Sequence, residues 1–245
     1  MNIQKLKNSS GVCLAELMIA IAAGLVVLSA TIQMLTHFQQ RMWDQYDTIG
    51  LHQDQRIGIG VMREELRLAG PGVSGIPAVL LRADQQEIEF TGNIGGYTTN
   101  LTGTVSPEVA ELPVVDGSGW VKGKRVLICS NERCVENHLA RDGQRSSLSL
   151  ASPLGQAFPV GSEVMILNRV RYYLSKSRSG RVSLMRQVDG GANPVVSDVS
   201  LFSLSYADRH GRPTLDPAIV SRVKVELSVG RNHRVLTSEV GLRAQ

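Results

Sequence analysis

An apolar segment near the N-terminus constrains the fold of this chain more than any other feature of its sequence. Residues 12–35 read VCLAELMIAIAAGLVVLSATIQML, and Glu16 is the single charged residue among them. As an α-helix that rises 1.5 Å per residue, the segment would be about 36 Å long, which exceeds the roughly 30 Å hydrocarbon core of a bilayer. The segment is therefore a candidate to span a membrane.

The residues before this segment predict its orientation. Lys5 and Lys7 are the only charges in MNIQKLKNSSG, and basic residues favour the cytoplasmic side of a membrane. We therefore expect the rest of the chain to lie outside the cytoplasm. One alternative is a secretory signal cut after Ala20–Ala22, although the apolar run is longer than such signals usually have. Another is an uncleaved signal anchor with Glu16 at headgroup level. A carboxylate deeper in the membrane would need a partner or a function.

The string GVCLAELMIA, from Gly11 to Ala20, resembles the class III leader junction of type IV prepilins and type II secretion pseudopilins. In that family an inner-membrane prepilin peptidase cuts after the Gly, and the new N-terminus is usually methylated. The resemblance places the cut between Gly11 and Val12, so that residues 1–11 form the leader. Glu16 then becomes the fifth mature residue, which is the family's near-invariant carboxylate. Val12 departs from the usual Phe of the pattern.

Glu16 has a physical role in this reading. The new α-amino group of Val12 would be a cation at the end of an apolar helix, and Glu16 of a neighbouring subunit could neutralise it. An unpaired charge in such a low-dielectric interior is costly. We therefore expect the pair to set the register between subunits.

A helical pattern continues beyond the apolar segment. Apolar residues recur at helical spacing with polar residues between them until Gly70-Pro71-Gly72, a stop signal. We expect residues 12–35 to form the transmembrane and assembly helix and residues 36–70 its amphipathic continuation. Glycines inside a helix are destabilising, so Gly58 and Gly60 are candidate soft points, as is Gly24.

Beyond residue 72 the apolar period changes from helical spacing to two, which is typical of strands. Strands are expected at 87–90, 124–129, 163–167 and 202–206, and hairpins at 170–174 with 182–186 and at 220–229 with 235–243. Residues 92–107 are expected to form a long surface loop. The predicted fold class is α+β and, by the resemblance, pilin-like: a long N-terminal helix packed on a mostly antiparallel β-rich body, residues 71–245.

Shorter strings in the body resemble the PilW group of minor pilins. They are the runs at 55–70, 170–174, 184–187, 206–208 and 240–243. This resemblance implies a minor subunit that helps prime type IV pilus assembly at or near the fibre tip. Its partners would be other minor pilins, the major pilin, a large tip adhesin, the prepilin peptidase and the inner-membrane assembly platform. Before assembly it would be a single-pass protein of the inner membrane with its body in the periplasm. After assembly it would lie in the fibre at the cell surface.

Two further functions stay open. The J-type minor pseudopilins of type II secretion share the long helix, the size range and a similar ending. The third reading is a periplasmic enzyme or receptor on an uncleaved anchor. The chain has no G-x-S-x-G, no phosphate loop and no H-E-x-x-H, so we do not expect an enzyme, a cofactor or a resident metal. Its formal net charge of +4 is too small and too scattered to indicate nucleic-acid binding.

Cys129 and Cys134 have four residues between them in a body expected to be exported. A disulfide is the leading interpretation because the periplasm is oxidising. With His138 the pair could suggest zinc, but a fourth ligand is missing. Two free buried thiols are the remaining alternative.

Two charged clusters have weaker interpretations. Asp208 and Asp216 flank a glycine, as in a calcium loop, but they lack a ladder of carboxylates, so a solvated loop is favoured. Arg178, Arg181 and Arg186 lie near one hairpin and could meet an acidic partner, which surface charge alone supports poorly.

Overall fold

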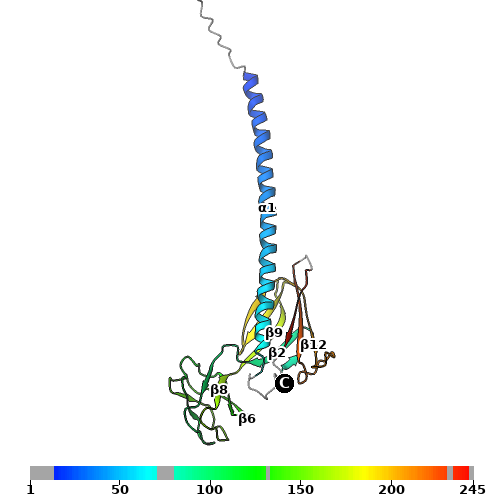
Figure 1. The fold of residues 1–245 in the computed structure, drawn as a ribbon. Helices are drawn as coiled ribbons and strands as arrows, with labels where there is room; N and C mark the ends of the chain where they lie inside the picture. The colour runs from blue at the N-terminus through cyan, green and yellow to red at the C-terminus, as the bar shows by residue number, and fades with distance from the viewer. Residues whose placement is uncertain (1–13, 71–79, 131–132, 231–233, 243–245) are drawn as a thin grey trace, which may run out of the picture. The chain divides into compact units, whose positions relative to one another are not determined.

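The computed structural model describes residues 14–70, 80–130, 133–230 and 234–242. It divides the chain into two units, residues 1–50 and residues 51–245. Helix α1 (Leu14–Arg67) runs through both as one element of 54 residues (Figure 1). The expected α+β class, a long apolar N-terminal helix followed by a mostly antiparallel β-sheet body, is confirmed.

The strands of the described residues form sheets whose named pairings are all antiparallel. In chain order they are β1 (Leu80–Ala83), β2 (Glu87–Gly92), β3 (Thr98–Asn100), β4 (Glu111–Pro113), β5 (Arg125–Ser130), β6 (Arg133–His138), β7 (Ser147–Ser149), β8 (Glu163–Ile166), β9 (Asn168–Lys176), β10 (Val182–Val188), β11 (Gly191–Val196), β12 (Val199–Ala207), β13 (Arg222–Val229) and β14 (Leu236–Gly241).

Two of the sheets pack with the C-terminal part of α1. One has the order β1-β2-β9-β10-β11 and the other β12-β13-β14. Both expected hairpins are present, as β9 with β10 and β13 with β14. Their buried side chains share one core with Met62, Leu66 and Ala69 of the helix segment, and its largest members include Phe90 and Tyr172. Figure 1 shows the cyan part of α1 beside β2 and β9.

The C-terminus of α1 is tied to this core by its backbone. Leu68 and Ala69 continue with short-range hydrogen bonds to Glu65 and Leu66. Gly70 then has φ of 90°, a left-handed conformation that glycine adopts without strain. Its N–H donates to the carbonyl of Thr91 at 2.7 Å, so the helix ends directly against β2.

A second core lies in the segment between β2 and β9. The sheet of order β3-β8-β5-β6 and the strand pair β4–β7 enclose it, and Leu112, Ile128, Leu148 and Phe158 are among its fully buried members. This segment, residues 93–167, is called the inserted lobe below; it includes the green strands β6 and β8 of Figure 1. The expectation of one long loop at 92–107 is wrong in part, because Thr98–Asn100 pair with β8 and Leu101 and Val105 are buried.

Gly58 is not the soft point that helix propensity suggests. A Cβ atom added there would overlap Cγ2 of Val196 in β11, so the missing side chain allows α1 to approach the sheet. Gly60, by contrast, has nothing within 4 Å of its added Cβ. Close packing and not flexibility therefore explains the first of these glycines.

Candidate functional site

The predicted processing and assembly residues lie at the N-terminal end of α1. Gly11 and Val12 fall outside the described residues, as does Cys13. Glu16 lies in the first turn of α1 with an exposed side chain. An acidic residue in the first turn interacts favourably with the helix dipole.

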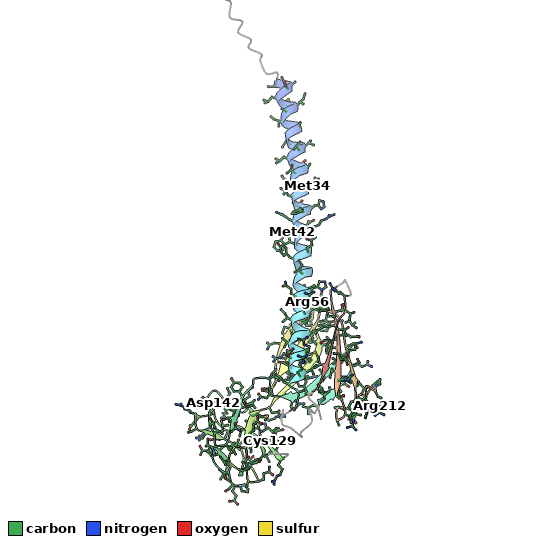
Figure 2. The ribbon with its side chains drawn as sticks, viewed as in Figure 1. Met34, Met42, Arg56, Cys129, Asp142 and Arg212 are labelled. Carbon is green, nitrogen blue, oxygen red and sulfur yellow. A yellow bond between two sulfur atoms is a disulfide. The ribbon has the colours of Figure 1, made fainter. Side chains whose placement is uncertain are left out.

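The helix that carries Glu16 presents apolar side chains along the unit of residues 1–50. Within the described residues, Leu14–Trp43 is long and apolar enough to cross a membrane. Met34 and Met42, labelled in Figure 2, project from the helix and are 76% and 37% exposed. Phe38 and Tyr46 are more than half exposed as well. An unpartnered apolar helix of this length needs lipid or other helices around it.

A buried glutamine fixes α1 to the β13–β14 hairpin. The side chain of Gln55 is fully buried. Its Nε2 donates to the carbonyl of Leu227 at 2.6 Å and to that of Arg234 at 3.0 Å, while its Oε1 lies 3.3 Å from Nδ1 of His52. These contacts satisfy the amide, as burial requires.

A charged cluster fixes the last turn of α1 to the five-stranded sheet. The carboxylate of Glu65 is bound by the guanidinium of Arg186, whose Nε lies 3.0 Å from both oxygens, and by the hydroxyl of Tyr172 at 2.5 Å. Burial, followed by the charge of Glu65, raises the pKa of Tyr172, so this hydroxyl stays protonated and donates. The hydrogen bond to Glu65 raises the pKa of Arg186. Arg186 is therefore bound to Glu65 within the chain, so its charge is not free for the acidic partner that the sequence suggested for Arg178, Arg181 and Arg186.

Cys129 and Cys134 face each other across the β5–β6 pair. Their sulfur atoms are joined in a disulfide, with the Cα atoms 4.2 Å apart. Figure 2 marks Cys129 in the inserted lobe. His138 lies four residues beyond Cys134, at the opposite end of β6. Among the residues that the structure describes, no three His, Cys, Asp or Glu side chains form a group that could hold a metal ion.

Asp208 organises the turn after β12. Its Oδ1 accepts hydrogen bonds from the N–H groups of His210 and Arg212, and its Oδ2 accepts one from Nε of Arg212, all at 2.8–2.9 Å. The backbone N–H of Arg212 is the main cause that lowers the pKa of Asp208. Both carboxylate oxygens thus serve the turn, and a guanidinium stands where a cation would need to bind.

Sequence reasoning missed the two polar contacts that attach the helix. Gln55 and Glu65 occupy the face of α1 that also carries Gly58, Met62 and Leu66, since these positions follow helical spacings of three and four. A polar residue on an otherwise apolar stripe is the signal that could have indicated them. Their partners on β10 and β13 are more than a hundred residues away and have no signal in the pattern.

Comparison of the chain with protein-family models, with curated proteins and with solved structures found no match.

Proposed function

We propose that this chain is a PilW-type minor pilin that helps prime type IV pilus assembly and lies at or near the fibre tip. The observation that carries the proposal is α1 itself: one helix of 54 residues whose apolar side chains are exposed along the unit of residues 1–50 and include the buried Met62 and Leu66 in the unit of residues 51–245. A helix divided in this way suits an assembly role, in which one half enters lipid or a bundle of helices and the other holds a body. We interpret the α+β architecture as pilin-like on this basis.

The class III junction around Gly11 and Val12 supports the same proposal. Cleavage there would leave an α-amino group four residues before Glu16. In an apolar bundle that amine and the Glu16 carboxylate of a neighbouring subunit would neutralise each other, which favours one register of assembly over others. The chain would be anchored in the inner membrane before assembly and lie in the fibre afterwards.

The size of the body supports a minor role. Residues 71–245 include the inserted lobe with its own core, and such bulk is difficult to repeat in a tight helical shaft. Glu16 argues against the outermost position, because its carboxylate is useful only where another subunit's amino terminus lies within reach. The proposed position is therefore close below the tip, among other minor pilins, the major pilin and a large adhesin.

Mass spectrometry of the N-terminus of the native protein tests the proposal, together with identification of its cross-linked neighbours. We expect a mature chain that begins at Val12 and carries a methylated α-amino group. We also expect its cross-linked neighbours to be pilins. Gly11→Leu should leave the full-length precursor in the membrane. Recovery of Met1 on protein isolated from fibres would contradict the proposal.

The same experiment separates the second candidate, a J-type minor pseudopilin. The helix and the junction favour both functions equally, because both groups are assembled from processed subunits. Cross-links to components of a type II secretion machine in place of pilins would select the pseudopilin. An intact N-terminus with neither set of partners would favour an anchored periplasmic enzyme or receptor.

A further inference from the structure

The β9–β10 hairpin runs beside α1 toward the end of the body at which the helix enters. Near the end of α1, Glu65 binds Arg186 of β10. Two turns earlier along the helix, Gly58 lies against Val196, whose partner in β10 is Leu184. Moving from Arg186 to Leu184 therefore means moving toward the N-terminus of α1. The tip of this hairpin lies further in the same direction, because β10 begins at the tip.

The β13–β14 hairpin has its tip at the same end. Gln55 binds the carbonyls of Leu227 and Arg234, one on either side of the tip. A Cβ atom added to Gly230 would lie 3.5 Å from Cδ1 of Leu51, and Leu51 is the first residue of the body unit. The two hairpin tips and the entry point of α1 thus share one end of the body.

Cationic side chains dominate this end. Among the described residues of this end, Asp54 and Asp198 are acids without an ion pair, whereas Glu226 is paired with Lys224 at 2.6 Å. In the part of the chain that the structure describes, five exposed cations at this end make no ion pair. The surface that they form is called the basic end below, and its residues are Arg56, Lys176, Arg178, Arg181 and Arg234. Figure 2 labels Arg56 on the helix. The basic end therefore has the charge that an anionic surface would recognise.

Chain connectivity keeps the basic end near any bilayer that α1 spans. The part of α1 that is long and apolar enough to cross a membrane, Leu14–Trp43, ends at Trp43, and the body unit begins at Leu51, so residues 44–50 join them. Even a fully extended chain of that length reaches only about 25 Å. When α1 spans a bilayer, phospholipid headgroups always lie within this distance of the basic end. A partner protein, by contrast, would first have to bind.

We propose that the basic end docks on anionic phospholipid headgroups while α1 anchors the chain in a bilayer. The inference rests on the membrane anchor of the proposed function and does not depend on the pilus role. Each Lys or Arg that reaches an anionic surface strengthens the attraction about fivefold, and the effect falls off within roughly 10 Å, the Debye length at moderate salt. Docking would hold the body against the membrane.

The test uses the full chain, reconstituted in lipid nanodiscs, with the disulfide intact and Cys13→Ser to remove the other thiol. A fluorophore at Ser179→Cys reports the tip of the β9–β10 hairpin, and one at Ala192→Cys reports the exposed start of β11, at the opposite end of β10. We expect discs with one quarter phosphatidylglycerol in phosphatidylcholine to protect the first label from iodide quenching. High salt or pure phosphatidylcholine should abolish this protection, and the second label should not respond.

Charge variants identify the residues responsible. Changing Lys176, Arg178 and Arg181 together to Gln should weaken docking on the order of 100-fold, as three fivefold effects combine. The matched control changes three exposed cations of the inserted lobe to Gln and leaves docking intact: Lys122, Arg133 and Arg145. Equal quenching in neutral and anionic discs, equal loss in both triple variants, or a chain that does not enter discs at all would overturn the inference. The presence or absence of cross-links to pilins tests only the proposed function and leaves the docking inference unaffected.

Discussion

Glu65 on the last turn of α1 and Arg186 on β10 form an ion pair across the packed surface between the helix and the five-stranded sheet. Arg186 Nε lies 3.0 Å from each carboxylate oxygen, and the side chain of Glu65 is only 11% exposed. The two residues are 121 positions apart in sequence, so the pair joins the last turn of α1 to a strand that is distant along the chain.

Removal of Glu65 should destabilise the body, because it leaves the partly buried guanidinium of Arg186 and the buried hydroxyl of Tyr172 without their acceptor. We expect Glu65→Leu to lower the free energy of unfolding by about 2–4 kcal/mol. This change in the free energy of unfolding is measured by urea titration of the full chain in detergent, with the circular dichroism of the β-sheet as the signal. The control is Glu64→Leu, whose side chain is 55% exposed and should change stability by less than about 0.5 kcal/mol. Equal effects of the two variants would argue against the pair as an attachment.

The same substitution, glycine to alanine, should change the stability of the protein in opposite directions at Gly58 and Gly60. Gly60→Ala should stabilise by about 0.5–1 kcal/mol, since alanine has the higher helix propensity and its Cβ meets nothing within 4 Å. Gly58→Ala should destabilise by about 1–3 kcal/mol because its Cβ overlaps Val196. Thermal unfolding of both variants and of the wild type measures the two changes in stability. Stabilisation by both would show that the helix does not approach β11 so closely.

The carboxylate of Glu87 should make stability depend on acid pH. Arg171 binds it at 2.9 and 3.1 Å and Arg82 at 2.7 Å, and the hydrogen bond from Arg171 is the main cause that lowers its pKa from the ordinary 4.5. A lowered pKa contributes stability above the unfolded-state value, and this contribution is lost as the pH falls through the folded-state value. Glu87→Gln should therefore cost about 1 kcal/mol at neutral pH and progressively less below pH 4.5.

Urea titrations at stepped pH compare Glu87→Gln with the wild type. Glu108→Gln is the control, because Glu108 is an exposed carboxylate with no ion pair among the described residues. It should follow the wild type at every pH. A difference for Glu87→Gln that stays constant from neutral to acid pH would contradict the assignment.

The disulfide of the β5–β6 pair should contribute modestly to stability. A closed loop this short restricts the unfolded chain little, so Cys134→Ser should cost about 2 kcal/mol. Peptide mapping without reductant should recover Cys129 and Cys134 in one linked peptide. Two thiols that alkylate in the native protein would refute the linkage, and Cys13→Ser should leave stability unchanged.

Glu16 should matter for association and not for folding. It lies in the unit of residues 1–50, outside the body, so Glu16→Ala should leave the unfolding of the body unchanged. If the chain assembles as proposed, loss of the carboxylate would leave a neighbour's amine unpaired, and recovery with partner subunits should fall at least tenfold, roughly the effect of 1.4 kcal/mol. Gln33→Ala, on the same helix, serves as the control for co-purification. Undiminished recovery of the Glu16 variant would exclude this role.

Local patterns in the sequence predicted the parts of the fold that depend on near neighbours. The helix to residue 67 and the hairpins β9–β10 and β13–β14 follow from periodicity and turn residues. The inserted lobe escaped prediction because its borders are set by the pairing of β2 with β9, and no local signal connects Gly92 with Asn168. Gly58 was misread for a related reason: propensity describes an isolated helix, whereas Val196 decides what fits there.

The candidate site divides in the same way. The positions of Gly11, Val12 and Glu16 relative to the apolar segment could be stated from sequence, and their roles stay predictions. The attachment of the helix through Gln55 and Glu65 could not be predicted from sequence, because the prediction would require knowing which distant strand lies opposite each residue.

The placement of the inserted lobe has a consequence for folding kinetics. β2 and β9 pair from Glu87 with Tyr173 to Gly92 with Asn168, so the lobe's two ends emerge side by side. Closing an unstructured loop of that length would cost about 2.5 kcal/mol more entropy than closing a four-residue turn. Because the lobe has a core of its own, it can collapse first and bring its ends together. The pairing of β2 with β9 in the five-stranded sheet then needs no closure of a long unstructured loop.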